Sequence, residues 1–195
     1  MTARGELASW AFPARLDTKP APDVNSPAPS VAEISFPRKD GKPVVIAFLR
    51  HCGCPFAEKI FLNLRRLAEE RQDVQFIAVS HSDQISTDHW TESIGGAGNV
   101  QIIVDNEKKI YAQYGLGVAS FWHVLNPWSM AEVFRLAFQE KIKNRPTETG
   151  TRWQISGMFA IDASGIVKYS HPSQTTDDMG DPAAALEAVQ STAKL

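Results

Sequence analysis

The sequence predicts an α/β domain whose sheet is parallel at its centre and antiparallel at one edge. Residues 44–49 and 74–80 form near-continuous apolar runs, which are typical of strands buried on both faces. Segments with helical apolar spacing alternate with these runs, in the order that produces parallel strands joined by crossover helices. Residues 158–161 and 166–169 flank the turn sequence Asp-Ala-Ser-Gly and therefore predict an antiparallel hairpin.

The remaining elements follow from spacing and from end signals. Residues 55–71 repeat apolar side chains at helical spacing, which predicts a helix that is buried along one side. This stripe consists of Phe56, Ile60, Leu64 and Leu67, with Phe61 beside it. The other expected elements are a helix at 83–93, a strand at 100–104, a short helix at 108–114 and a last helix at 181–192.

The N-terminal residues 1–30 are expected to form an arm that precedes the domain at 31–195. Five prolines lie between residues 13 and 30, and such a segment is extended, with little helix or sheet of its own. Trp10 and Phe12 precede the prolines and are expected to anchor the arm on the domain.

Residues 118–153 are unusually aromatic and predict a helical insert, in which Asn126 and Pro127 supply the start of a helix. One interpretation is an extra helix that covers a sheet edge. The other is a lid or a pocket wall beside the site carried by the sheet. In the second interpretation, the candidate substrate-binding side chains are Trp122, Trp128, Phe134 and Arg152.

Composition excludes several classes of protein. The 195 residues include 20 basic and 22 acidic side chains, and a net charge of −2 gives no electrostatic reason to bind nucleic acid or an acidic membrane surface. Two cysteines are too few for a disulfide scaffold or a multi-cysteine zinc module. The sequence contains neither an apolar run that would span a membrane nor the apolar core of a secretory signal.

The chain ends in Ala193-Lys194-Leu195, which resembles the peroxisomal address Ser-Lys-Leu with alanine in place of serine. The alternative is a frayed terminus that ends in this way by chance. In either case we expect an intracellular protein, in the peroxisome or in the cytoplasm.

Both cysteines lie just after the first predicted strand, in the segment Arg50-His51-Cys52-Gly53-Cys54-Pro55. Pro55 suits the first position of a helix, so Cys54 is expected at the N-cap. Unpaired backbone N–H groups and the positive end of the helix dipole favour the thiolate there, which is the nucleophilic form. Arg50 and His51 add positive charge if they point toward it. We therefore predict that Cys54 is a reactive thiol, the alternative being a small buried residue in a tight turn.

Cys52 has two interpretations that the sequence does not separate. It is close enough to Cys54 to form a strained, easily reduced disulfide across Gly53. Alternatively, its side chain points into the packing face of the strand.

Two further side chains follow predicted parallel strands, where catalytic groups gather. His81 follows the second strand and is a candidate base near Cys54, with Asp105 behind it after the third strand. The alternative is an edge histidine without a role.

Neither a metal nor another cofactor is predicted. The side chains of His51, Cys52, Cys54 and His81 are of types that bind zinc, but their spacing matches no recurrent zinc motif. The common nucleotide-binding and hydrolase motifs do not occur in the sequence.

The chain resembles thioredoxin-fold proteins of the alkyl hydroperoxide reductase/thiol-specific antioxidant group (AhpC/TSA), with the peroxiredoxin-like 2 branch as the nearest match. The resemblance rests on the strand-Arg-x-x-Gly-Cys-helix segment at 45–71, on the hairpin from Gly157 to His171 and on the interposed helical region. It implies a three-layer thioredoxin-like fold, with helices on both faces of a mixed sheet, and thiol-based reduction of peroxides or disulfides. The first cysteine of that branch's Cys-x-x-Cys segment matches Cys54, whereas Ala57 takes the place of the second.

The function predicted is therefore that of a thiol-dependent, peroxiredoxin-like oxidoreductase with an antioxidant role. Its expected partners are a peroxide or disulfide substrate and a thiol reductant, and the resemblance also implies a homodimer. The first alternative is a thioredoxin fold reassigned to non-redox chemistry on a small molecule, in a pocket beside the aromatic insert. The second alternative is a redox-silent binding or scaffold protein.

Overall fold

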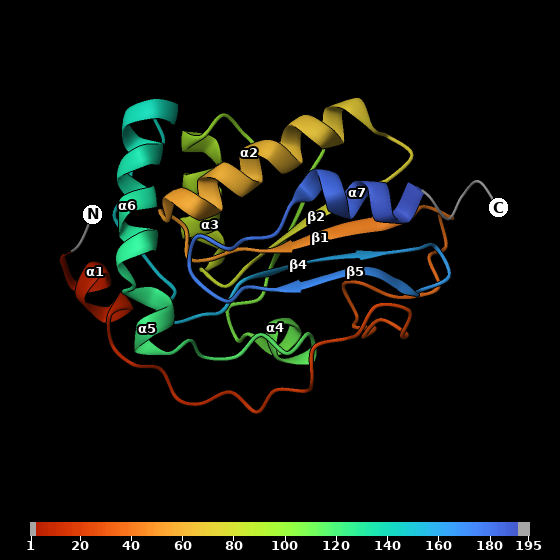
Figure 1. Cartoon of the computed structure of the whole chain (residues 1–195), viewed down its shortest axis with the longest axis horizontal. Helices are drawn as coiled ribbons and strands as arrows, with labels where there is room; N and C mark the ends of the chain where they lie inside the picture. The colour runs from red at the N-terminus through yellow and green to blue at the C-terminus, as the bar shows by residue number, and fades with distance from the viewer. Residues whose placement is uncertain (1–2, 191–195) are drawn as a thin grey trace.

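A five-stranded mixed sheet forms the centre of the computed structural model, which describes residues 3–190 of the chain (Figure 1). The strands are β1 (Val44–Phe48), β2 (Gln75–Ser80), β3 (Gln101–Val104), β4 (Gly157–Ile161) and β5 (Val167–Pro172). Their order across the sheet is β3-β2-β1-β4-β5. β1, β2 and β3 run parallel to one another, whereas β4 is antiparallel to β1 and β5 is antiparallel to β4. The predicted sheet, parallel at its centre with an antiparallel edge, is therefore confirmed.

Three helices cover one face of this sheet: α2 (Pro55–Glu70), α3 (Gln84–Ser93) and α7 (Pro182–Gln190). The stripe predicted for α2 is buried and packs against Val45 and Ala47 of β1. Alternate residues of a strand point to opposite faces, so the neighbouring residues of β1 face the other layer. Burial on both faces explains why this strand is apolar without alternation.

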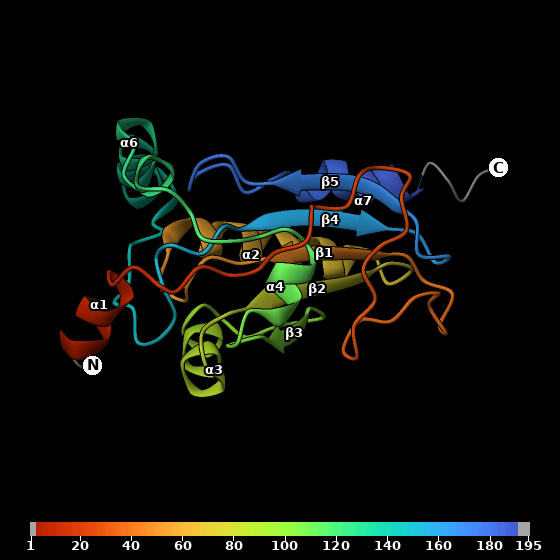
Figure 2. The same cartoon turned by 90° about the horizontal axis from the view of Figure 1, so that it is seen from below.

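The opposite face carries the short helix α4 (Lys109–Gln113) and part of the N-terminal arm (Figure 2). Phe48 of β1 packs there among Tyr111, Tyr114 and Phe159, with ring centroids 4.9–5.7 Å from its own. The predicted third layer is therefore present, and the fold-class prediction is confirmed.

Residues 13–30 form neither a helix nor a strand, as their prolines predict. Backbone hydrogen bonds nevertheless fix this segment: the Lys19 N–H donates to the Ala112 carbonyl and the Asn25 N–H donates to the Val167 carbonyl. The arm thereby crosses from α4 to β5 (Figure 2).

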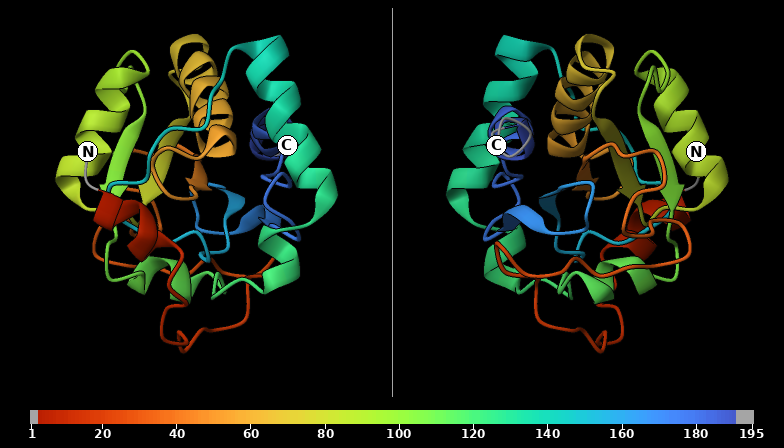
Figure 3. Two further views of the ribbon diagram at one scale, coloured as in Figure 1. Left: turned by 90° about the vertical axis from the view of Figure 1, so that its left-hand side faces the viewer. Right: turned by 90° about the vertical axis from the view of Figure 1, so that its right-hand side faces the viewer.

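The carboxyl ends of β1, β2 and β3 lie at the end of the molecule that carries α1 (Ala3–Ser9), α5 (Phe121–Val124) and α6 (Pro127–Arg135) (Figures 1 and 3). A π-helical turn, η1 (Leu136–Glu140), continues α6. The predicted helix start in the insert is confirmed, because the Asn126 side chain accepts a hydrogen bond from the Ser129 N–H and Pro127 occupies the first turn. α1 has no counterpart among the predicted elements.

Two sequence-based expectations are not tested by these elements. The C-terminal tripeptide Ala193-Lys194-Leu195 lies outside the described residues, so the peroxisomal address stays a prediction, as does the homodimer. No helix within the described range 3–190 is both long enough and apolar enough to cross a bilayer.

Candidate functional site

The chain leaves β1 at Phe48 and enters α2 at Pro55 through a tight turn that contains both cysteines. The Cys54 N–H donates to the His51 carbonyl over 3.1 Å, which closes the turn. Gly53 adopts φ +101°, a conformation that glycine reaches at little cost. As a result, the two cysteine side chains enter different cavities on either side of the turn.

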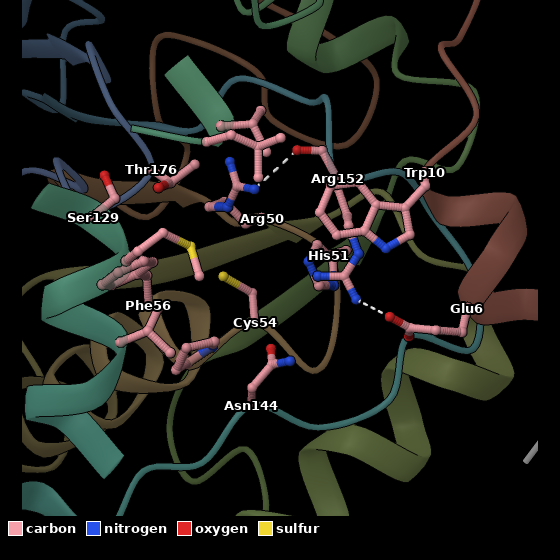
Figure 4. Close-up of a pocket in the computed structure, with 15 residues that line it drawn as sticks. Glu6, Trp10, Arg50, His51, Cys54, Phe56, Ser129, Asn144, Arg152 and Thr176 are labelled. Atoms are coloured by element: carbon pink, nitrogen blue, oxygen red, sulfur yellow. Dashed lines mark hydrogen bonds and ion pairs between the residues drawn. The ribbon is translucent and has the colours of Figure 1, made fainter. Parts of the chain in front are cut away.

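Cys54 occupies the N-cap of α2, as predicted, and its side chain makes no capping hydrogen bond. The residue is only 4% exposed, and its side chain points into a cavity of about 220 Å³ (Figure 4). The free N–H groups of the first helical turn and the helix dipole place partial positive charge beside this sulfur. Helix N-termini are among the positions at which reactive cysteines occur.

One wall of this Cys54 cavity is apolar and the other is polar. The apolar wall comes mainly from the insert, and its residues are Phe56, Val124, Leu125, Met130 and Val133. The polar wall contains two arginines, Arg50 and Arg152, and one carboxylate, Glu6, together with the neutral polar side chains His51, Ser129, Asn144 and Thr176 (Figure 4). The cavity can therefore hold a small molecule with one charged or polar end and one apolar end.

Arg50 is a buried cation that lacks a carboxylate partner. The residue is 4% exposed, and its Nη2 donates to the Arg152 carbonyl over 2.9 Å. Its Nε and Nη1 atoms are buried without a hydrogen-bond partner, and no ion pair joins Arg50 to an acidic side chain among residues 5–190. Such a group carries a large desolvation cost, which a nearby anion would offset.

Arg152 is held in place by the N-terminal helix. Its guanidinium forms an ion pair with Glu6, and its Nε donates to the Ser9 hydroxyl over 3.1 Å. The guanidinium also lies 4.7 Å from the centre of the Trp10 ring. Because Glu6 compensates its charge, Arg152 adds less net positive charge to the cavity than Arg50 does.

The predicted anchoring of the arm by Trp10 and Phe12 is confirmed. The Phe12 ring stacks on Trp153 with centroids 4.1 Å apart, and Trp10 meets the same ring edge-on at 6.3 Å. The Trp153 indole N–H donates to the Trp10 carbonyl over 3.0 Å. This contact fixes α1 beside the cavity.

His51 lies at the cavity but does not supply the positive charge expected of it. Its ring is buried, and Nδ1 lies 3.1 Å from the Thr147 hydroxyl oxygen. Burial, reinforced by the charges of Arg50 and Arg152, holds the pKa of His51 well below its usual range. The imidazole is therefore neutral near pH 7, and this part of the prediction is wrong.

His81 is not the base beside Cys54 that the sequence suggests. It lines neither of the two cavities at the cysteines, and its Nε2 lies 3.1 Å from the Thr151 carbonyl oxygen. Asp105 does not stand behind it either. Instead, the Asp105 carboxylate accepts hydrogen bonds from the N–H groups of Lys109 and Ile110 and so fixes the start of α4. His81 and Asp105 both lie at the ends of strands, as predicted. Hydrogen-bonding backbone groups of Thr151 and of α4, respectively, hold these side chains in positions where they do not contact Cys54.

Cys52 is a free thiol that points away from Cys54, so the packing interpretation holds and the disulfide is not formed. Its Sγ lies 3.6 Å from the Ser80 hydroxyl and 3.8 Å from the Thr87 hydroxyl, against α3. Burial raises the pKa of the Cys52 thiol. Its side of the turn opens to a second cavity of about 260 Å³, lined in part by Trp90 and Arg145.

The aromatic side chains proposed for substrate binding lie elsewhere. Trp122, Trp128 and Phe134 are 67%, 79% and 60% exposed, and they do not line the Cys54 cavity. α6 is rotated so that its smaller residues face the cavity and its large aromatic residues face solvent. Arg152 is the one member of that predicted set on the cavity wall. Ser129 and Val133, spaced four residues apart after the Asn126 N-cap, are the sequence signal that could have identified the inner face of the helix.

No group of three or more histidine, cysteine or acidic side chains is placed to hold a metal ion within the described part of the chain. The four zinc-compatible side chains considered above are separated, because Cys52 and Cys54 face different cavities and His81 faces Thr151.

A family model described as "AhpC/TSA antioxidant enzyme" matches residues 63–175, which is more than half of the chain. The chain belongs to this AhpC/TSA family. The match begins within α2, after both cysteines, so family membership by itself assigns no role to Cys52 or Cys54. No curated protein sequence matches the chain.

Solved structures similar to this AhpC/TSA protein share its fold. A peroxiredoxin-like protein from Aquifex aeolicus gives a TM-score of 0.60 at 15% identity, covering 89% of this chain and 90% of that one. A thiol peroxidase from Chromobacterium violaceum gives 0.59 at 14% identity, covering 92% and 93%. A reduced 2-Cys peroxiredoxin from Plasmodium vivax gives 0.56 at 16% identity, covering 89% and 83%. At these identities the comparisons establish the peroxiredoxin-like, thioredoxin-like fold and no more.

Proposed function

We propose that this AhpC/TSA protein reduces peroxides with Cys54 as the attacking thiol. The observation that carries the proposal is the position of that thiol, at the N-terminus of α2 and inside a cavity that contains Arg50. A nucleophilic cysteine requires positive surroundings, and this thiol has both a helix N-terminus and a buried arginine. The family match and the peroxiredoxin-like fold support the same class of reaction.

In the first step, the Cys54 thiolate attacks one oxygen of a hydroperoxide and breaks the O–O bond. That oxygen stays on sulfur as a sulfenic acid, and the other leaves as an alkoxide or hydroxide that takes up a proton. Sulfur is oxidised and the peroxide is reduced. Hydrogen-bond donors and cationic charge along the polar wall stabilise the negative charge that develops on the leaving oxygen.

The second step requires a thiol from outside the chain. Cys52 is the other cysteine of the protein, and its sulfur faces Ser80 and Thr87 across the turn from the Cys54 cavity. An internal disulfide would need the turn at Gly53 to rearrange. An external thiol instead attacks the sulfenic sulfur, releases water and leaves a mixed disulfide, and a second thiol then restores Cys54.

The test is a single-turnover oxidation followed by intact-mass measurement. Reduced protein receives one equivalent of hydrogen peroxide, and the mass is recorded over seconds. We expect the protein to gain one oxygen atom, and we expect Cys52→Ser to gain it at the same rate. Cys54→Ser is expected to remain unchanged over the same period.

Three outcomes would contradict the proposal or its second step. An unchanged mass over minutes in the wild-type protein would exclude rapid peroxide reduction and favour non-redox chemistry in the same cavity. Oxidation that persists in Cys54→Ser and disappears in Cys52→Ser would show that Cys52, and not Cys54, is the reactive thiol. A loss of two hydrogen atoms would show that an internal disulfide forms and would overturn the proposed external resolution.

A further inference from the structure

The proposed reaction removes one negative charge from the cavity, because the attacking thiolate of Cys54 becomes an uncharged sulfenic acid. Glu6 pairs with Arg152 and His51 is neutral, so the attacking thiolate of Cys54 and the unpaired guanidinium of Arg50 are the remaining charges among the residues that line this cavity. Once Cys54 becomes an uncharged sulfenic acid, Arg50 is left as a buried cation without a counter-ion. Arg50 lines the cavity, and its Nε and Nη1 atoms are buried without a hydrogen-bond partner (Figure 4).

An uncompensated buried cation attracts an anion more strongly than an exposed one does, because little water screens the interaction. The oxidised form of the site is therefore the form suited to a negatively charged ligand. In the proposed reaction, the ligand that arrives at this stage is the reductant.

Access to the sulfur limits the size of that reductant. Cys54 is 4% exposed, beneath α6 and beside α1, and its cavity holds about 220 Å³. A cysteine on the surface of a folded protein does not reach such a sulfur unless the walls move. A small molecule does, and a cavity of this volume suits one of only a few heavy atoms.

We infer that the resolving reductant is a small thiol that carries a carboxylate, with the carboxylate bound beside Arg50 and the thiol sulfur directed at Cys54. This inference rests on the proposed function and names the class of its second substrate. The carbon chain of such a molecule lies against the apolar wall formed by residues such as Val124 and Met130. Attack forms an S–S bond between the ligand and Cys54, and the sulfenic oxygen leaves as hydroxide, which is protonated to water.

The reductant is tested on the Cys52→Ser protein, oxidised at Cys54 and mixed with single thiols. The probes are 3-mercaptopropionate and its neutral amide, 3-mercaptopropionamide, compared at equal thiolate concentration, and reduced thioredoxin serves as the macromolecular probe. We expect the carboxylate to react roughly tenfold or more faster than the amide, as the loss of one charge-assisted hydrogen bond implies. Arg50→Gln is expected to abolish this preference. Arg66→Gln, which removes an exposed guanidinium paired with Glu70 on α2, is expected to retain it.

Equal rates for the two small probes, or faster reduction by thioredoxin, would overturn the inference.

A binding experiment without peroxide tests the anion site independently of the proposed function. Propionate and propionamide are titrated into Cys54→Ser, and only propionate is expected to raise the melting temperature. If propionate binds but peroxide leaves Cys54 unchanged, the proposed function fails and the anion site stands. If neither stabilises the protein, the anion site is wrong whatever the result with peroxide. If Arg50→Gln fails to fold, the comparison of charged and neutral probes in Cys52→Ser and Cys54→Ser still tests the inference.

Discussion

Replacement of Gly53 by alanine is expected to destabilise the protein by about 2 to 6 kcal/mol and to abolish reaction at Cys54. A Cβ atom at this position would lie 2.8 Å from the Arg145 carbonyl oxygen and 2.9 Å from that of Pro146. Both are backbone atoms, so the overlap is relieved only if the chain moves. The φ of +101° adds backbone strain for any residue that has a side chain.

The loop that would have to move supports the site. The Arg145 N–H donates to the Gly53 carbonyl over 2.9 Å, and the Arg145 side chain pairs with Glu58 on α2 at 2.9 Å. The Thr147 hydroxyl, two residues further on, contacts His51. Displacing the loop therefore disturbs the turn that directs Cys52 and Cys54 into different cavities.

Gly96→Ala is the matched control for this substitution. Gly96 also has a positive φ, +86°, but no atom lies within 4 Å of the position that its Cβ would occupy. It reports the cost of backbone strain alone, about 1 to 3 kcal/mol. Chemical denaturation measures both variants. Equal losses of unfolding free energy in Gly53→Ala and Gly96→Ala would contradict the close packing described at the turn.

Stability is expected to fall as the pH is lowered from 7 to 5, with buried histidines as the main cause. Burial lowers the pKa of His81 to about 4, from 6.5 for a free imidazole. As the pH falls, the unfolded chain therefore takes up this proton before the folded chain does. The stabilising contribution is complete above pH 6.5 and is lost as the pH falls toward 4. For His81 alone, the loss between pH 7 and pH 5 is about 2 kcal/mol.

His51 and His123 change stability in the same direction, because burial lowers both of their pKa values, that of His123 to about 4. Urea unfolding at several pH values measures the effect. His81→Gln is expected to be less stable at pH 7 yet to show a shallower slope between pH 7 and pH 5. His89→Gln, which alters a largely exposed side chain of α3, is expected to keep the wild-type slope. If His81→Gln kept the wild-type slope, His81 would not be a source of the loss of stability at low pH.

The sheet and its main helices could be predicted because their apolar patterns are local and strong. Residues 44–48 are buried on both faces, and α2 begins at Pro55 as its end signal indicates. The N-cap position of Cys54 follows from the same signal. These features depend on residues that are close in sequence.

The parts that could not be predicted depend on contacts between distant segments. Arg152 is fixed by Glu6 and Ser9, more than 140 residues away, in a helix that no sequence pattern predicts. The orientation of α6 could not be predicted, because the large aromatic side chains Trp128 and Phe134, proposed to bind substrate, face solvent instead of the cavity. Arg50 has no carboxylate partner, and this could not be predicted because it depends on where distant acidic side chains lie in the folded protein.

Competitive alkylation distinguishes the two cysteines, of which we propose that Cys54 is the reactive thiol and Cys52 is not. Folded, reduced protein is treated with a limiting amount of iodoacetamide at pH 7, and the modified cysteine is identified by peptide mass. We expect Cys54 to react roughly tenfold or more faster than Cys52, because Cys54 lies at a helix N-terminus in the cavity that contains Arg50, whereas burial raises the pKa of Cys52. Faster modification of Cys52, or equal rates for the two, would contradict the proposal.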